Sequence, residues 1–251
     1  MDLVGKTAFV TGGSGDIGGA IARALAAAGV DVAISYVGHL DNAAATVDAV
    51  QAAGRRSLAI QLDQRDSAAI DAAVTQVVAE FGRVDILVNN AAWNIGIPFP
   101  DLDALTGEIW DRVLETNLRG PYLLARALSP HLSAYGTGRI VNIASTGGLY
   151  PKSSSIAYSV SKAGVIHLTR CLAVALAPNV TVNCIAPGLV EGTRMAQRIP
   201  EEVVQQVRRQ VVLGRSASMQ DIAEQVLTFC RAETITGQVL IIDGGLPGCM
   251  R

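Results

Sequence analysis

Short runs of β-branched and aliphatic residues alternate along this chain with longer Ala- and Leu-rich stretches of helical period. The short runs are apolar on both faces, as parallel strands must be when helices cover both sides of a sheet. We therefore predict an α/β fold with a doubly wound, seven-stranded parallel sheet. The expected strands are 7–10, 31–34, 57–61, 86–89, 138–143, 180–185 and 239–242. The expected helices are 17–28, 40–53, 67–81, 103–134, 156–177, 201–210 and 219–230.

No linker, charge run or internal repeat divides the 251 residues, so we expect a single domain over 1–251. The stretch 188–214 departs from the alternation, because it follows Pro187, contains Pro200 and carries a more polar helical segment. We interpret this stretch as a lid over the site, with an ordinary surface helix as the alternative.

Composition excludes several classes of protein. Hydrophobic residues make up 50% of the chain and charged residues only 17%, which excludes disorder as the main state. No apolar window approaches the roughly 18 residues that a membrane-spanning helix needs. Lys and Arg number 20 against 22 Asp and Glu, so the basic excess of a nucleic-acid-binding protein is missing. The first residues also lack the basic and apolar regions of a secretory signal.

The cysteines and histidines show no metal-ligand spacing. The four cysteines form no Cys-x-x-Cys pair, and the three histidines are far apart in the sequence. We expect reduced thiols in a cytoplasmic protein with no metal site. The cysteines are Cys171, Cys184, Cys230 and Cys249.

A glycine-rich turn follows the first predicted strand and precedes a helix. It reads Thr11-Gly12-Gly13-Ser14-Gly15-Asp16-Ile17-Gly18-Gly19. Glycines let the backbone turn sharply and approach a pyrophosphate, and the helix N-terminus offers unpaired N–H groups. This context predicts a dinucleotide site, and the alternative is a tight turn whose glycines serve packing alone. The expected cofactor contacts here are Gly12, Ser14, Asp16, Ile17 and Gly18.

The turn resembles that of the short-chain dehydrogenase/reductase family, whose pattern is Thr-Gly-x-x-x-Gly-x-Gly. Thr11, Gly12 and Gly18 match this pattern, whereas Asp16 stands at the middle glycine. A carboxylate close to a pyrophosphate should repel it. We therefore expect Asp16 to cap the following helix, and the alternative is that it points to solvent.

The end of the second strand bears on the choice of cofactor. Dinucleotide folds place there an acidic residue for NAD or a basic residue for NADP, but this chain has Tyr36. The missing carboxylate favours NADP(H), with Ser35, Tyr36 and His39 as hydrogen-bonding groups for a phosphate. NAD(H) stays as the alternative, because no Lys or Arg lies in the turn or just after Tyr36.

The resemblance implies further cofactor contacts. Asp63, after the third strand, would accept a hydrogen bond from the adenine amino group. Asn90, in Asn89-Asn90-Ala91-Ala92, resembles part of the family's Asn-Asn-Ala-Gly motif and would leave room for the adenine ribose. The backbone near Gly188 and Val190 would bind the nicotinamide carboxamide. Read without the family, these residues are ordinary turn and cap residues.

Ser145, Tyr158 and Lys162 form the expected catalytic group. Tyr158 and Lys162 are four residues apart, so they share one face of a helix. A free phenol has a pKa of about 10, and a neighbouring ammonium lowers it, which allows proton exchange near neutral pH. The resemblance makes Tyr158 the acid/base, Lys162 the residue that tunes it and binds the nicotinamide ribose, and Ser145 the residue that orients the carbonyl. Enoyl reductases of similar fold place the lysine six residues after the tyrosine, so this spacing favours carbonyl or alcohol chemistry.

Asn117 completes the expected site. The resemblance implies that its backbone carbonyl positions a water beside Lys162 in a proton relay, whereas a bend in the helix is the alternative. We therefore expect an NAD(P)-dependent oxidoreductase, a carbonyl reductase or secondary-alcohol dehydrogenase that acts on a small-molecule alcohol or ketone. A non-catalytic, cofactor-sensing regulator or scaffold is the alternative. The resemblance also implies a homotetramer, without a nucleic-acid or membrane partner.

Overall fold

The computed structural model describes residues 1–248, so Cys249 lies outside the described residues. Its seven strands form one parallel sheet in the order β3-β2-β1-β4-β5-β6-β7. The doubly wound parallel sheet predicted from the sequence is confirmed. The strands are β1 (Thr7–Val10), β2 (Asp31–Tyr36), β3 (Ser57–Gln61), β4 (Ile86–Asn89), β5 (Gly138–Ile143), β6 (Val180–Pro187) and β7 (Val239–Ile242).

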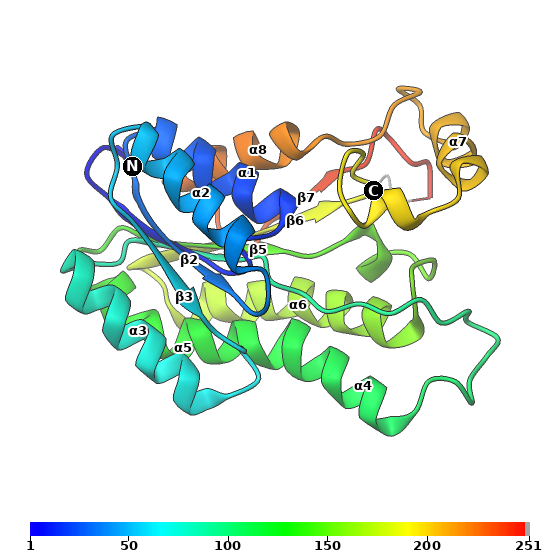
Figure 1. Ribbon diagram of the computed structural model, residues 1–251, viewed down its shortest axis with the longest axis horizontal. Helices are drawn as coiled ribbons and strands as arrows, with labels where there is room; N and C mark the ends of the chain where they lie inside the picture. The colour runs from blue at the N-terminus through cyan, green and yellow to red at the C-terminus, as the bar shows by residue number, and fades with distance from the viewer. Residues whose placement is uncertain (249–251) are drawn as a thin grey trace.

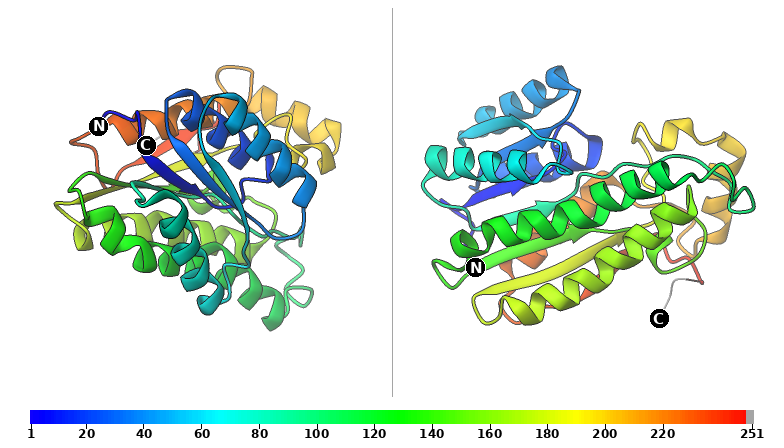
Figure 2. Two further views of the ribbon diagram at one scale, coloured as in Figure 1. Left: turned by 60° about the vertical axis from the view of Figure 1, so that its left-hand side comes forward. Right: turned by 90° about the horizontal axis from the view of Figure 1, so that it is seen from below.

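Helices cover both faces of this sheet (Figure 1). One layer contains α1, α2 and α8, and the other contains α3, α5 and α6, as the two turned views also show (Figure 2). The α-helices are α1 (Asp16–Ala27), α2 (Leu40–Ala52), α3 (Ser67–Phe81), α4 (Gly107–Leu114), α5 (Gly120–Ser133), α6 (Ile156–Ala175), α7 (Glu201–Gln210) and α8 (Met219–Arg231).

Each helical layer encloses its own apolar core. Val10, Val88 and Ile143 face the layer of α1 and α8, whereas Phe9, Leu87 and Ile140 face the layer of α3 and α5. Successive residues of one strand thus point into opposite cores, which is why the strands are apolar throughout. The small aliphatic side chains that dominate the composition fill both cores.

The expected helix 103–134 is wrong as a single element. Helix α4 begins only at Gly107, because the Thr106 hydroxyl accepts a hydrogen bond from the Ile109 N–H and caps it. A π-helical turn, Glu115–Arg119, then separates α4 from α5. Two expected strands, 31–34 and 180–185, are shorter than the observed ones, because β2 extends to Tyr36 and β6 to Pro187.

Segment 188–214 leaves the layers after β6 and contains a short 3₁₀ turn, Ala196–Arg198, followed by α7. Helix α7 stands beyond the end of the sheet in Figure 1, near the loops that follow the strands. Within residues 1–248, no helix combines the length and the apolar character needed to cross a membrane.

Candidate active site

The ends of β1 and β4 meet where the strand order reverses, since β2 and β3 lie on one side of β1 and β4 to β7 on the other. In open parallel sheets this point forms the ligand-binding crevice. Thr11 and Asn90 tie the two strand ends together. The Thr11 hydroxyl accepts hydrogen bonds from the N–H groups of Asn90 and Ala91, each at 3.0 Å. The Asn90 side chain donates to the carbonyl oxygens of Thr11 at 2.9 Å and Gly12 at 3.3 Å.

The glycines of the turn are required by close backbone approaches. Gly12 has a φ of +66°, which favours glycine. A Cβ at Gly18 would lie 2.3 Å from the Gly12 carbonyl oxygen and 2.6 Å from the Asn90 side-chain nitrogen. A Cβ at Gly13 would lie 2.5 Å from Ile34. The turn therefore presents backbone without bulky side chains at the start of α1. A pyrophosphate of a dinucleotide can approach such a backbone closely and meet the N–H groups of the helix N-terminus.

Asp16 does not cap α1, so that expectation is wrong. It is the first residue of the helix, the capping position belongs to Gly15, and no side chain caps the helix. The Asp16 carboxylate instead accepts a hydrogen bond from the Arg194 N–H at 2.7 Å and pairs with the Arg194 guanidinium at 3.3 Å. A carboxylate one position past the cap is badly placed to accept from the first turn, and Arg194 offers it a charged partner.

The residues expected near the adenosine have partners of their own. Ser35 is buried, and its hydroxyl accepts from the Gly12 N–H at 3.2 Å, so it braces the turn. Tyr36 is the last residue of β2 and is half-buried. The Arg65 guanidinium binds the Asp63 carboxylate at 2.6 Å and holds the pKa of that carboxyl below its ordinary value. Arg65 is a cation near this edge that the sequence reasoning did not single out.

The predicted catalytic residues come from two neighbouring elements. Ser145 follows β5, and its hydroxyl accepts from the Gly147 N–H at 3.1 Å. Tyr158 and Lys162 lie one turn apart on α6, which begins where the Ser155 hydroxyl accepts from the Tyr158 N–H. The Lys162 Nζ donates to the Ile143 carbonyl oxygen at 2.8 Å and lies 5.6 Å from the centre of the Tyr158 ring.

Burial dominates the electrostatics of this pair. Burial raises the pKa of Tyr158 to about 12, and a hydrogen bond with the Ser145 hydroxyl opposes that rise. Burial lowers the pKa of Lys162 to about 8. The expected net lowering of the phenol's pKa is not found in this arrangement, because burial dominates and the Lys162 ammonium group is directed to the Ile143 carbonyl. Tyr158 is therefore a protonated phenol at neutral pH, the form that can give a proton.

Asn117 lies in the π-helical turn and is fully buried. Its side chain accepts from the Trp93 N–H at 2.7 Å and donates to the Trp93 carbonyl oxygen at 2.9 Å. It also donates to the Ser161 hydroxyl at 3.1 Å, and Ser161 donates to the Tyr158 carbonyl oxygen at 2.8 Å. Sequence reasoning missed Trp93 and Ser161, although Ser161 lies directly before Lys162.

The turn after β6 lies beside the closing strand. The Gly188 N–H donates to the Ile242 carbonyl oxygen at 2.8 Å, and Val190 pairs with Ala217 in an isolated parallel bridge. A Cβ at Gly188 would lie 2.7 Å from the Cβ of Asp243, so glycine is needed for this approach. The structure thus brings the turn after β1, the end of β5, the start of α6 and the turn after β6 to one edge of the sheet.

Comparison with known proteins identifies this arrangement. A family model described as "Enoyl-(Acyl carrier protein) reductase" matches residues 13–247. The chain belongs to the short-chain dehydrogenase/reductase family. The 3-oxoacyl-[acyl-carrier-protein] reductase of Staphylococcus aureus is 36% identical over 245 residues, which cover 96% of this chain and 98% of the relative.

Two solved structures of similar fold contain nicotinamide cofactors. A short-chain dehydrogenase from Burkholderia cenocepacia in complex with NADP is 38% identical, with a TM-score of 0.90, and the match covers 98% of this chain and 99% of that one. An NAD⁺-bound xylitol dehydrogenase is 28% identical, with a TM-score of 0.92, and the match covers 98% and 100%. The expected family and activity are confirmed: this chain is an NAD(P)-dependent oxidoreductase that acts on alcohol and ketone groups.

The geometry of the turn predicts the effect of Gly18→Ala. The added Cβ meets the Gly12 carbonyl and the Asn90 side chain, so the turn must open. We expect NADPH binding, measured by fluorescence titration, to weaken roughly tenfold or more, with a stability loss of about 1–3 kcal/mol in urea. Gly107→Ala is the matched control, because nothing lies within 4 Å of its Cβ. Equal NADPH affinity in the Gly18→Ala variant and the control would contradict the assignment.

Proposed function

We propose that this protein is a carbonyl reductase that interconverts a ketone and its secondary alcohol, with NADP(H) as the preferred cofactor. The observation that carries the proposal is a protonated Tyr158 phenol beside the Ser145 hydroxyl, one helical turn from Lys162. A dinucleotide on the turn after β1 would extend toward these residues along the same edge of the sheet.

Each residue has a distinct role in the proposed reaction. The nicotinamide cofactor, when bound, supplies the hydride for the carbonyl carbon. Tyr158 gives its phenolic proton to the carbonyl oxygen as that oxygen gains negative charge. Ser145 donates a hydrogen bond to the same oxygen and orients it. In the oxidative direction the proton returns to Tyr158.

Lys162 and Asn117 support this proton transfer. Lys162, whose pKa is about 8, is largely protonated at neutral pH, so it favours the phenolate that Tyr158 becomes. We also propose that Lys162 binds the nicotinamide ribose. We also assign to the backbone carbonyl of Asn117 the water that returns a proton from solvent. The π-helical turn supports this role, since such turns leave carbonyl groups without their usual helical partners.

The spacing of Tyr158 and Lys162 supports carbonyl chemistry over reduction of a C=C bond, although the matching family model is described as an enoyl reductase. Four residues place both side chains on one face of α6, where Ser145 also lies close to Tyr158. The Staphylococcus aureus relative, by its name, reduces a 3-oxo group. A 3-oxoacyl thioester is therefore the first ketone class to assay.

The preference for NADP(H) rests on the end of β2. Tyr36 occupies the position where an NAD-selective fold carries a carboxylate for the ribose 2′-hydroxyl. We place the adenosine between Tyr36, Asp63 and Asn90. We place the nicotinamide carboxamide on the backbone at Gly188 and Val190.

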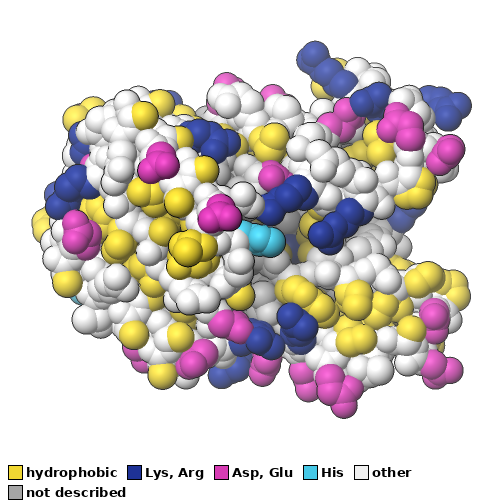
Figure 3. Space-filling model, in the orientation of Figure 1, with side chains coloured by type: hydrophobic (Ala, Val, Ile, Leu, Met, Phe, Trp, Pro, Cys, Tyr) yellow, Lys and Arg dark blue, Asp and Glu magenta, His cyan; other side chains and the backbone are white. Residues whose placement is uncertain are grey.

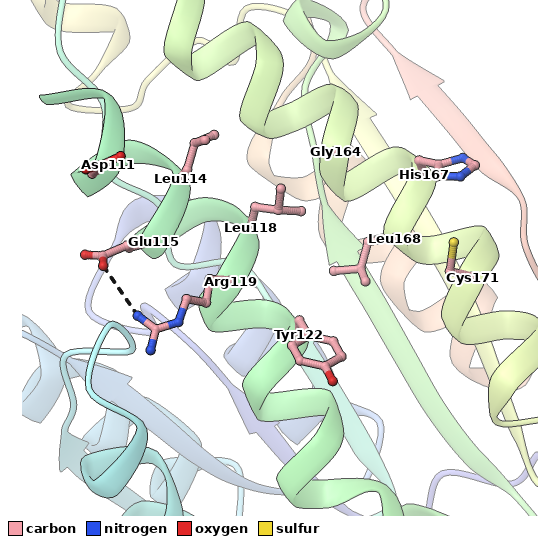
Figure 4. A pocket seen from close by; sticks show the side chains of 10 residues that line it. All are labelled: Asp111, Leu114, Glu115, Leu118, Arg119, Tyr122, Gly164, His167, Leu168 and Cys171. Atoms are coloured by element: carbon pink, nitrogen blue, oxygen red, sulfur yellow. Dashed lines mark hydrogen bonds and ion pairs between the residues drawn. The ribbon is translucent and has the colours of Figure 1, made fainter. Parts of the chain in front are cut away.

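We further propose a single cytoplasmic domain that assembles as a homotetramer, with segment 188–214 as a substrate lid. A groove between α4, α5 and α6 supports the assembly (Figure 4). Its lining includes Leu114 of α4, Leu118 of the π-helical turn and Leu168 of α6. Leu118 packs against Gly164 within the chain, and the apolar lining that they share with Leu168 gives a second copy a surface to cover away from Tyr158 and Lys162.

Tyr158→Phe tests the catalytic role. The variant loses the transferable proton but keeps the ring, so we expect NADPH binding within about twofold and kcat lower by roughly 10²-fold or more. The measurement is NADPH oxidation with a panel of ketones that includes a 3-oxoacyl thioester. Tyr135→Phe, at an exposed tyrosine, is the matched control and should retain activity. An unchanged kcat in the Tyr158→Phe variant would rule out this residue as the acid.

Cofactor choice has its own test. Because no carboxylate faces the adenosine ribose from the end of β2, kcat/KM should be higher with NADPH than with NADH. The comparison uses one ketone substrate under identical conditions. A tenfold preference for NADH would contradict the assignment.

A further inference from the structure

The glycine-rich turn acquires a cation from a distant part of the chain. Residues 11–19 contain no Lys or Arg. The structure brings Arg194, which is 178 residues from Asp16 in the sequence, onto this turn from segment 188–214. In the face shown in Figure 3, Lys and Arg side chains border a hollow near the centre of the molecule.

Three contacts fix Arg194 at the turn. Its backbone N–H donates to the Asp16 carboxylate at 2.7 Å, and its Nε lies 3.3 Å from the same carboxylate. Its Nη2 donates to the Ser14 carbonyl oxygen at 3.2 Å. The guanidinium is thus held against both the backbone and the only charged side chain of the turn.

The Arg194 guanidinium has N–H donors left over for a ligand. An arginine has five N–H groups, and these contacts use its Nε and one Nη2 proton. The Arg194 side chain is 42% exposed, so the remaining donors are not sealed inside the protein. Thr193 has no such freedom, because its hydroxyl donates to the Val190 carbonyl oxygen and accepts from the Ala196 N–H.

The charge of Asp16 explains why a cation is needed here. Asp16 is the first residue of α1, where a bound pyrophosphate would meet the helix N-terminus. An unpaired carboxylate at that point would repel the phosphates. Arg194 neutralises it and adds a planar fork that matches phosphate oxygens.

We propose that Arg194 binds the pyrophosphate of the dinucleotide and that Asp16 is the positioning residue that holds it there. This proposal rests on the proposed cofactor site and adds to that site one residue, Arg194, from the proposed lid. The pyrophosphate is assigned rather than the adenosine 2′-phosphate, because Arg194 contacts Ser14 and Asp16 at the start of α1, whereas Tyr36 marks the ribose end. Cofactor binding and docking of segment 188–214 are therefore coupled through one side chain.

The test measures binding without turnover, by fluorescence titration of NADPH and NADH. Arg194→Ala removes the fork and leaves Asp16 unpaired, so we expect both dissociation constants to rise by a similar factor, roughly tenfold or more. Arg194→Lys keeps the charge but not the fork, so its loss should be intermediate. Arg198→Ala is the matched control, since Arg198 is an exposed arginine of the same segment and should bind both cofactors as the wild type does.

A double-mutant cycle tests the role of Asp16. In an Asp16→Gly background there is no unpaired carboxylate, so Arg194→Ala should weaken binding less than it does with Asp16 present. Equal losses in the two backgrounds would overturn the positioning role. The thermal midpoint of each variant, measured by circular dichroism, shows whether the fold is kept. If Arg194→Ala is unstable, Arg194→Lys takes its place in the cycle.

The remaining outcomes separate this proposal from the proposed function. Unchanged NADPH and NADH affinities in Arg194→Ala would overturn the pyrophosphate contact, and a loss confined to NADPH would overturn it in favour of the 2′-phosphate. Failure of the wild-type protein to bind either dinucleotide would instead overturn the cofactor site on which both proposals depend.

Discussion

The candidate active site depends on the hydrogen bonds that join the ends of β1 and β4. The Thr11 hydroxyl accepts from two N–H groups that follow β4, and the Asn90 amide returns two hydrogen bonds to the turn after β1. These bonds satisfy backbone groups at the point where two parallel strands diverge and no further strand can pair with them. They also force Gly18 so close to Gly12 that no side chain fits. Helix α1 therefore begins directly beside the joined strand ends.

Burial on both sides of the sheet sets the chemistry at the same edge. Lys162 is enclosed beneath the end of β5, where the Ile143 carbonyl accepts its hydrogen bond and burial lowers its pKa to about 8. The same environment raises the pKa of Tyr158 to about 12. The site thus combines a phenol that keeps its proton with a lysine whose pKa burial brings closer to neutral. Asn117 joins Trp93, in the loop after β4, to Ser161, which donates to the backbone carbonyl of Tyr158, so the backbone of α6 at this pair is tied to that loop.

Local pattern was enough to predict most of the fold, because strands buried on both faces and helices of regular period leave a clear signal in the sequence. The spacing of Tyr158 and Lys162 and the turn at Thr11–Gly19 also predicted residues that the structure brings to one edge of the sheet. The expectations that failed concern contacts between residues that are distant in the sequence. The partner of Asp16 is 178 residues away, and the π-helical turn at Asn117 is filled by Trp93 and Ser161. The pKa of Tyr158 depends on burial and on where the Lys162 ammonium is directed, and neither follows from a spacing of four.

Hydrogen–deuterium exchange with mass spectrometry, with and without NADPH, tests the central claim most directly because it needs no substrate. A dinucleotide at the junction of β1 and β4 should slow amide exchange in residues 11–19 and 88–92 and in the start of segment 188–214, residues 188–194. Exchange in α3 and at the outer face of α6 should not change. Protection confined to other surfaces, or no protection at saturating NADPH, would contradict a cofactor site built on the hydrogen bonds between Thr11 and Asn90.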